Sequence, residues 1–174
     1  QDEAQAAVDA LVAEGMTMIP PVDHRHIIAG QGTLGLENSE EMPEVETVLV
    51  QVSGGGLISG VAAALKARLP HVRIVGISME RGAAMHTSLA AGHPVEVTEL
   101  ATLADSLGGG IGLDNCFTFP MVRELVDDLV LLTEAEIANG IRHCYWEVRQ
   151  IVEGSGAVGV GALLAGKITL SGPT

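Results

Sequence analysis

The chain has 174 residues, a formal charge of −13 at pH 7 and a pI near 4.7. This acidic balance repels nucleic-acid phosphates and anionic membrane surfaces, and the apolar runs are far shorter than the roughly 18–20 residues of a membrane span. We therefore expect no nucleic-acid or membrane partner. An apolar content of 47% with only 2% aromatic residues suits a buried sheet of small aliphatic residues between helices.

Helix-like and strand-like segments alternate along the chain. Composition and flanking Gly or Pro residues predict helices over 2–15, 28–42, 57–69, 81–92, 121–128, 134–152 and 154–167. Short apolar runs predict strands over 16–20, 47–52, 72–78 and 129–133. Thr133 and Glu136 form a capping box, and the glycine-bearing stretch 93–120 is irregular, with room for a short strand. The alternation indicates a single α/β domain with a parallel sheet and flanking helices.

The stretch "VSGGGLISG" places three glycines between a strand-like run and a helix. Glycines let backbone N–H groups approach an anion, and a helix N-terminus adds partial positive charge. Ser53 adds a hydroxyl to Gly54, Gly55, Gly56 and Leu57. The pattern predicts a phosphate-binding loop, with a merely tight strand-to-helix turn as the alternative.

Two other phosphate-site patterns fail on this sequence. A P-loop needs a lysine directly after its glycines, and neither Lys66 nor Lys167 stands in that position. The stretch 154–159, "GSGAVG", matches the dinucleotide fingerprint by letter. A helix-like segment precedes it, however, and no acidic residue follows at the ribose position, so its small residues indicate close helix packing instead.

Four motifs in order cover nearly the whole chain: "HIIAGQGTLGLE", "VLVQVSGGGLISGVAAALKARLP", "TLADSLGGGIGL" and "VEGSGAVGVGALLAGK". Together they resemble the threonine/serine dehydratase branch of the fold type II, tryptophan synthase beta-like, pyridoxal-phosphate enzymes, which includes serine racemase. The stretches "SMERGAAMHTSL" and "LADSLGGGIGLDN" look most like the dehydratase of ectoine and hydroxyectoine utilisation. The resemblance implies that residues 1–174 are the C-terminal portion of a single large domain, incomplete at both ends.

The resemblance implies that pyridoxal 5'-phosphate is the cofactor and that the glycine loop binds its phosphate. Relatives typically have four glycines and an apolar residue there, so Ser53 replaces the first glycine. Asp105 and Ser106 in "LADS" match a motif close to the cofactor and substrate, where Ser106 departs from glycine. Glu153 in "VEGSG" matches a glutamate on the cofactor's ring side, with an ordinary helix-end role as the alternative.

Two departures from the family pattern limit what these residues can do. Ser78 and Ala84 occupy the positions of the two acidic metal ligands of many relatives, so we predict no metal site. No Ser-x-Lys-x-Arg-Gly motif is present, so we expect no catalytic residue in this chain and place the Schiff-base lysine upstream. Lys66 lies roughly 15 Å along its helix from the loop. The chain alone should therefore be inactive.

The implied activity is the loss of water from a β-hydroxy amino acid, threonine-like, serine-like or derived from hydroxyectoine, to give a 2-oxo acid and ammonia. A racemase or β-replacement synthase of the same fold, and a non-catalytic anion-binding domain, stay open as alternatives. The resemblance further implies a small amino acid as substrate, a homodimer and a cytoplasmic location. Cys116 and Cys144 stand in no metal or redox spacing and are expected to be buried or half-buried free thiols.

Overall fold

The structure is a computed structural model that describes residues 2–174. Its helices are α1 (Asp2–Ala13), α2 (Arg25–Glu41), α3 (Gly56–Arg68), α4 (Ala84–Ala91), α5 (Thr118–Leu125), α6 (Glu134–His143) and α7 (Gly154–Leu164). Its strands are β1 (Thr47–Gln51), β2 (Arg73–Met79) and β3 (Asp128–Leu132), and two short elements are the 3-10 turn η1 (Asp105–Leu107) and the π-helical turn η2 (Cys144–Val148). No helix in this range is long and apolar enough to cross a membrane.

The three strands form one parallel sheet in the order β1-β2-β3. Val50 of β1 lies opposite Gly76 of β2, and Gly76 lies opposite Leu129 of β3. Parallel pairing places all three carboxyl ends at the same edge of the sheet. The α/β architecture expected from the alternating pattern is confirmed.

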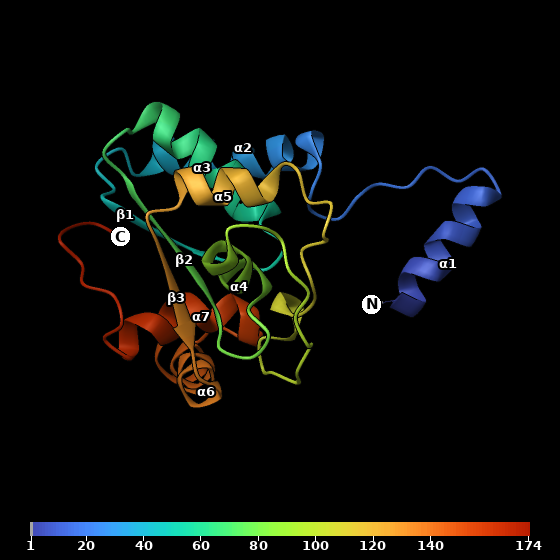
Figure 1. Ribbon diagram of the computed structural model, residues 1–174. Helices are drawn as coiled ribbons and strands as arrows, with labels where there is room; N and C mark the ends of the chain where they lie inside the picture. The colour runs from blue at the N-terminus through green and yellow to red at the C-terminus, as the bar shows by residue number, and fades with distance from the viewer. Residues whose placement is uncertain (1) are drawn as a thin grey trace.

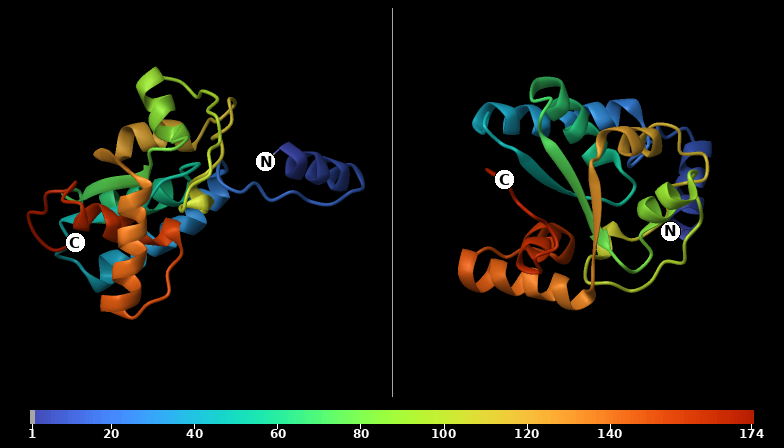
Figure 2. Two further views of the ribbon diagram at one scale, coloured as in Figure 1. Left: turned by 90° about the horizontal axis from the view of Figure 1, so that it is seen from below. Right: turned by 60° about the vertical axis from the view of Figure 1, so that its left-hand side comes forward.

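Helices cover both faces of the sheet (Figure 1; Figure 2, right), with α2, α3 and α5 on one face and α6 and α7 on the other. The central strand shows how the two faces are built. Ile74 packs in an apolar cluster with Ile58 and Val122, whereas the next residue, Val75, packs in a second cluster with Ile137. Successive side chains of a strand point to opposite faces, so an all-apolar strand needs both helical layers. Helix α1 lies apart from these layers, at the end of an extended connection (Figure 1).

Helices α2 and α3 pack at backbone distance because glycines line their contact. A Cβ on Gly35 would lie 2.7 Å from the carbonyl oxygen of Val61. A Cβ on Gly60 would overlap the carbonyl oxygen of Ile28. Gly35 of α2 and Gly60 of α3 therefore serve helix packing, and this packing holds α3 and the loop before it in place.

The structure corrects three predictions. Residues 16–20, expected to be a strand, are in no sheet and are almost entirely exposed, because no neighbouring strand offers hydrogen bonds. The helix expected to reach residue 152 leaves α geometry at Cys144 and stops at Arg149, whose φ is 62°. The N–H of Gln150 then bonds to the carbonyl of Cys144 and closes the end. Cys116, expected to be buried or half-buried, is exposed, while Cys144 is buried as expected.

Candidate cofactor site

The predicted phosphate loop follows β1 at the carboxyl edge of the sheet. Gly55, the residue before α3, has φ 89° and ψ −4°, a left-handed backbone that glycine adopts without steric cost. The chain therefore turns from strand to helix within a few residues. Ser53 and Leu57 are half-buried, and the glycines between them are buried.

Four successive N–H groups of the loop, those of residues 54–57, have no acceptor among the described residues. None of them donates a hydrogen bond within the described part of the chain, and the first N–H to do so is that of Ser59, to the Gly55 carbonyl at 3.0 Å. The first turn of α3 contains no acidic side chain. Buried N–H groups are nearly always paired, and a helix N-terminus carries partial positive charge. This end of α3 therefore fits an anion such as a phosphate.

The glycines of the loop also pack against protein. A Cβ on Gly54 would lie 2.7 Å from Cγ2 of Val22, and a Cβ on Gly56 would lie 3.2 Å from the Val22 Cα. A Cβ on Gly55 would lie 2.8 Å from the Met85 Cε. The tight-turn interpretation thus explains part of the glycine content. The glycines let neighbouring segments close on the loop while its N–H groups stay unpaired.

Asp23 joins the segment before α2 to the start of α5. Its carboxylate accepts hydrogen bonds from the N–H groups of Cys116, Phe117 and Thr118 at 2.8, 2.9 and 2.7 Å. Burial raises the pKa of Asp23, but these backbone bonds favour the ionised form more strongly and hold the pKa below its ordinary value. The three bonds also explain why α5 begins at Thr118 rather than at residue 121.

Sequence reasoning missed both Asp23 and Thr118. The Thr118 side chain is fully buried, and its hydroxyl donates a hydrogen bond to the Gly54 carbonyl at 2.7 Å. Asp23 and Thr118 are 95 positions apart in the sequence, and Gly54 and Thr118 are 64 apart. No local spacing links such positions, so a single sequence carries no signal for these contacts.

The segment that contains Asp105 and Ser106 is held by the start of α6. The Thr102 hydroxyl and the Leu103 N–H donate to the two carboxylate oxygens of Glu134 at 2.6 and 2.8 Å. Since α6 follows β3 directly, this anchors the segment at the carboxyl edge of the sheet. Asp105 and Ser106 are both exposed on η1.

Glu153 caps the N-terminus of α7. Its carboxylate accepts hydrogen bonds from the N–H groups of Ser155 and Gly156 at 2.8 and 2.7 Å. This is the geometry of a helix N-cap, so the ordinary helix-end role describes its contacts here, and its role toward a cofactor stays a prediction. The Ser155 hydroxyl is buried and has no partner within residues 2–174.

The start of α7 lies directly against the segment that leads into η1. A Cβ on Gly154 would overlap the carbonyl oxygen of Leu103 and lie 3.0 Å from the N atom of Ala104. Only glycine permits this approach. The contact brings Glu153 and Asp105, which are far apart in the sequence, onto neighbouring segments.

All the predicted cofactor residues lie at one edge of the sheet. Arg73, at the start of β2, donates a hydrogen bond to the Thr169 carbonyl beyond the end of α7 at 3.2 Å. Helix α7 therefore runs antiparallel to β2 and begins near the carboxyl ends of the strands. Within the described residues, however, no hydrogen bond or ion pair joins the glycine loop to Asp105 or Glu153.

Both lysines make ion pairs with carboxylates of the fold. Lys66, in the last turn of α3, lies 2.7 Å from an Asp127 carboxylate oxygen. Lys167, beyond the end of α7, lies 2.8 Å from a Glu136 carboxylate oxygen. Each lysine thus has a structural partner in this fold. That the Schiff-base lysine lies upstream of this chain stays a prediction.

The described residues contain no group of three or more His, Cys, Asp or Glu side chains arranged to hold a metal ion. At the two positions that the family resemblance assigned to acidic ligands, Ser78 donates its hydroxyl to the Val52 carbonyl at 2.8 Å and Ala84 begins α4.

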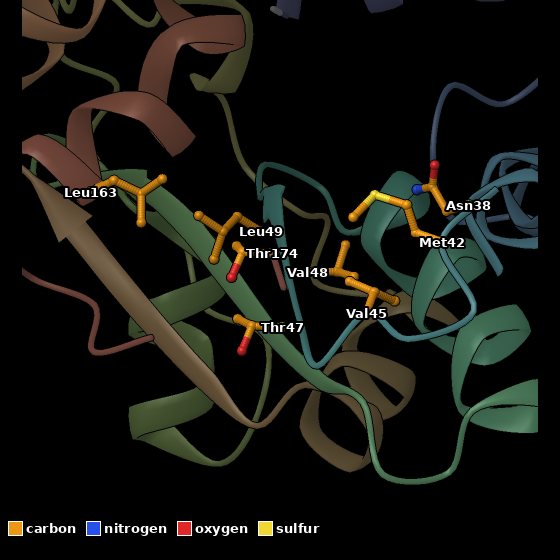
Figure 3. Close-up of a pocket in the computed structure, with 8 residues that line it drawn as sticks. All are labelled: Asn38, Met42, Val45, Thr47, Val48, Leu49, Leu163 and Thr174. Atoms are coloured by element: carbon orange, nitrogen blue, oxygen red, sulfur yellow. The ribbon is translucent and has the colours of Figure 1, made fainter. Parts of the chain in front are cut away.

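A cavity of about 280 Å³ lies at the opposite, amino end of β1, between α2 and α7 (Figure 3). Its lining residues are Asn38, Met42, Val45, Thr47, Val48, Leu49, Leu163 and Thr174. None of these side chains is ionisable, so the cavity offers no group for acid–base chemistry. The glycine loop remains the candidate site.

Comparison with known proteins identifies the family of this chain. The family model described as "Pyridoxal-phosphate dependent enzyme" matches residues 1–174. A Sinorhizobium fredii protein named "Putative threonine dehydratase" is 62% identical over 173 residues, which cover 99% of this chain and 52% of that protein. The L-threonine ammonia-lyase of Geobacter sulfurreducens is 43% identical over 175 residues, which cover 99% of this chain and 43% of that protein.

The solved structure of maize serine racemase is similar in fold as well as in sequence. It matches with a TM-score of 0.86 and 38% identity over 94% of this chain and 51% of its own. The expected fold type II architecture is thus confirmed, and the chain spans about half the length of the relatives it matches. The chain belongs to the family of pyridoxal-phosphate dependent enzymes.

Proposed function

We propose that residues 1–174 form the phosphate-binding portion of a pyridoxal-phosphate-dependent dehydratase. The whole enzyme removes water from a β-hydroxy amino acid and releases a 2-oxo acid and ammonia. One observation carries the proposal: the four successive N–H groups of residues 54–57, at the N-terminus of α3, have no acceptor within the described residues. The similarity to proteins named threonine dehydratase and L-threonine ammonia-lyase supports the choice of reaction.

The residues of this chain have distinct tasks in the proposal. The loop from Ser53 to Leu57 binds the phosphate through backbone N–H groups, and the Ser53 hydroxyl adds a further donor. Asp105, Ser106 and Glu153 form a polar wall at the same edge of the sheet. When bound, pyridoxal phosphate supplies the electron sink that makes removal of the substrate's α-proton possible. The lysine that holds the cofactor comes from outside these residues.

The test compares two polypeptides, the product of the complete gene and residues 1–174 alone. We expect the complete product to form a 2-oxo acid and ammonia from L-threonine or L-serine, and the 174-residue chain to form none. Dialysis against a carbonyl reagent that removes pyridoxal phosphate should abolish the activity, and adding the cofactor back should restore it. Steady 2-oxo acid formation by the 174-residue chain would contradict the proposal that its lysine lies elsewhere.

A narrower substrate is proposed from the stretches 78–89 and 103–115, which resemble the dehydratase of hydroxyectoine utilisation. Substrate profiling decides this point. A kcat/KM for an amino acid derived from hydroxyectoine that exceeds the value for L-threonine supports the narrower substrate, and the reverse order removes it.

A racemase is the second candidate, because the maize enzyme that shares this fold is named serine racemase. Chiral chromatography of L-serine incubated with the complete gene product separates the two activities. D-serine as the main product would replace the dehydratase proposal. The homodimer and the cytoplasmic location stay predictions, and light scattering of the complete product tests the first.

A further inference from the structure

Thr118 lies where the start of α5 meets the glycine loop. Its side chain is fully buried, accepts a hydrogen bond from Asn115 Nδ2 at 2.7 Å and lies 2.7 Å from the Gly54 carbonyl oxygen. A hydroxyl has one proton to donate. Since the amide of Asn115 is the donor in the first contact, the Thr118 proton points to Gly54. The direction of both hydrogen bonds is therefore fixed.

The bond from Thr118 orients a peptide plane of the loop. The Gly54 carbonyl and the Gly55 N–H belong to the same planar trans peptide, so they point in opposite directions. Holding the carbonyl toward α5 turns the Gly55 N–H away from α5. That N–H is one of the four that have no acceptor within the described residues.

A closed ring of contacts keeps Thr118 in place. Asp23 accepts a hydrogen bond from the N–H of Thr118 at 2.7 Å, and its chain neighbour Val22 packs on Gly54 and Gly56. The loop is thus held between the 22–23 segment and α5. A glycine loop left without such contacts would sample many backbone conformations. In this ring, the Thr118 hydroxyl is the group that bonds the loop itself.

We infer that Thr118 is a positioning residue for the phosphate of the cofactor: its hydroxyl bond to the Gly54 carbonyl sets the peptide orientation that presents the Gly55 N–H to the anion. The inference rests on the proposed function, because it takes the phosphate of pyridoxal phosphate as the anion at the loop. It assigns no direct contact between Thr118 and the cofactor. A side chain that acts only through the backbone should affect phosphate binding without changing the rest of the site.

The test measures binding of pyridoxal phosphate, and of pyridoxal without the phosphate, to the complete gene product. Thr118→Val keeps the shape of the side chain but removes the proton donor. We expect its dissociation constant for pyridoxal phosphate to rise about tenfold, the effect of one buried hydrogen bond. The dissociation constant for pyridoxal should stay within about twofold of wild type, by the same reasoning. The phosphorus NMR resonance of the bound cofactor should also shift.

Three further variants separate positioning from stability. Thr118→Ser keeps the hydroxyl and should bind pyridoxal phosphate nearly as wild type does. Thr118→Ala differs from Thr118→Ser by one oxygen atom and should lose as much affinity for pyridoxal phosphate as Thr118→Val does. The alanine–serine pair therefore replaces the valine variant if that variant fails to fold. Thr87→Val removes a similar hydroxyl-to-carbonyl bond on α4, to Ala83 at 2.9 Å, and should leave both affinities unchanged.

Each outcome bears on one of two statements. The positioning role of Thr118 would be overturned if Thr118→Val and Thr118→Ala lost as much affinity for pyridoxal as for pyridoxal phosphate. It would also be overturned if neither variant lost affinity for pyridoxal phosphate. A wild-type protein that binds pyridoxal as tightly as pyridoxal phosphate would instead overturn the phosphate role of the loop. The two failures are therefore distinguishable.

Discussion

The ammonium group of Lys66 lies 2.7 Å from a carboxylate oxygen of Asp127, at the end of α3 opposite the glycine loop. The same carboxylate accepts the N–H of Ile74 at 2.7 Å, so Asp127 ties α3 to the start of β2. Burial raises the pKa of Asp127, but its bonds to Lys66 and Ile74 outweigh this and lower the pKa overall. The pair is structural, and one of the two lysines is thereby committed to the fold.

This arrangement predicts unequal effects for the two partners. Lys66→Ala removes a partly exposed ion pair and should lower the free energy of unfolding by about 1 kcal/mol or less. Asp127→Ala also leaves the Ile74 N–H unpaired and should cost about 1–3 kcal/mol. Urea titration measures both values. In the complete gene product, Lys66→Ala should keep its bound cofactor, and loss of the cofactor's absorbance would show that Lys66 carries it.

Acid should weaken the contact between Asp23 and α5. The folded-state pKa of Asp23 lies below the ordinary value of about 3.9, so the unfolded chain takes up the proton first as the pH falls. Its stabilisation is therefore complete above the ordinary pKa and is lost as the pH falls through the lowered one. The Asp23→Asn variant cannot ionise. The difference in unfolding free energy between wild type and variant should be constant from about pH 7 to pH 5 and shrink toward pH 3.

If wild type and Asp23→Asn differ in unfolding free energy by the same amount at pH 7 and at pH 3, the charge of Asp23 does not stabilise its contact with α5. Comparing the two proteins at each pH matters because Asp127 and Glu136 also have lowered pKa values. Their contribution is common to both proteins and cancels.

Substituting Gly55 should cost more than substituting another left-handed glycine. Gly55 and Gly92 have φ values of 89° and 80°, so alanine costs about 1–2 kcal/mol of backbone strain at either position. A Cβ at Gly92 meets open space, whereas at Gly55 it would lie 2.8 Å from the Met85 Cε. Gly55→Ala should lose about 1–3 kcal/mol more, from overpacking, and should also weaken cofactor binding. Chemical denaturation measures the free energy of unfolding of both variants. If Gly55→Ala and Gly92→Ala lose the same amount, the side chains of α4 and α5 around Gly55 move aside without cost, which contradicts the prediction.

Gly154→Ala tests the contact that brings Glu153 beside Asp105. The new Cβ would overlap the Leu103 carbonyl, so α7 and the segment before η1 must move apart, at a cost of about 1–3 kcal/mol. Gly30→Ala is the matched control, because its Cβ meets open space on α2. It should stabilise the protein by about 0.5–1 kcal/mol through helix propensity. Thermal unfolding should show a lower melting temperature for Gly154→Ala and a higher one for Gly30→Ala than for the wild type.

The sequence predicted correctly those elements whose structure depends on interactions between residues a few positions apart. The strand, glycine loop and helix between residues 47 and 68 were predicted within a residue or two, because periodicity and glycine placement act over a few positions. The Thr133–Glu136 capping box is present with both of its hydrogen bonds, for the same reason. Strand-like composition failed at residues 16–20, since a strand also requires a neighbour that the local sequence does not specify.

Contacts between distant segments could not be predicted in this way. The sequence indicated which residues could surround a phosphate, but not that Asp23 holds the start of α5 or that Thr118 bonds the loop. It also left Glu153 with two possible roles, and only the positions of the Ser155 and Gly156 N–H groups show that its carboxylate caps α7. Such relationships arise from the fold as a whole.

The ring formed by residues 22–23, Gly54 and Thr118 has a consequence for the order of events during protein synthesis. The ribosome delivers the glycine loop before it delivers α5, which lies 64 positions later at Thr118. Until α5 emerges and docks, the Gly54 carbonyl lacks its donor and the loop lacks one of its two walls. With the phosphate role proposed for this loop, we expect the nascent loop to bind phosphate poorly and the cofactor to load only after the sheet has folded.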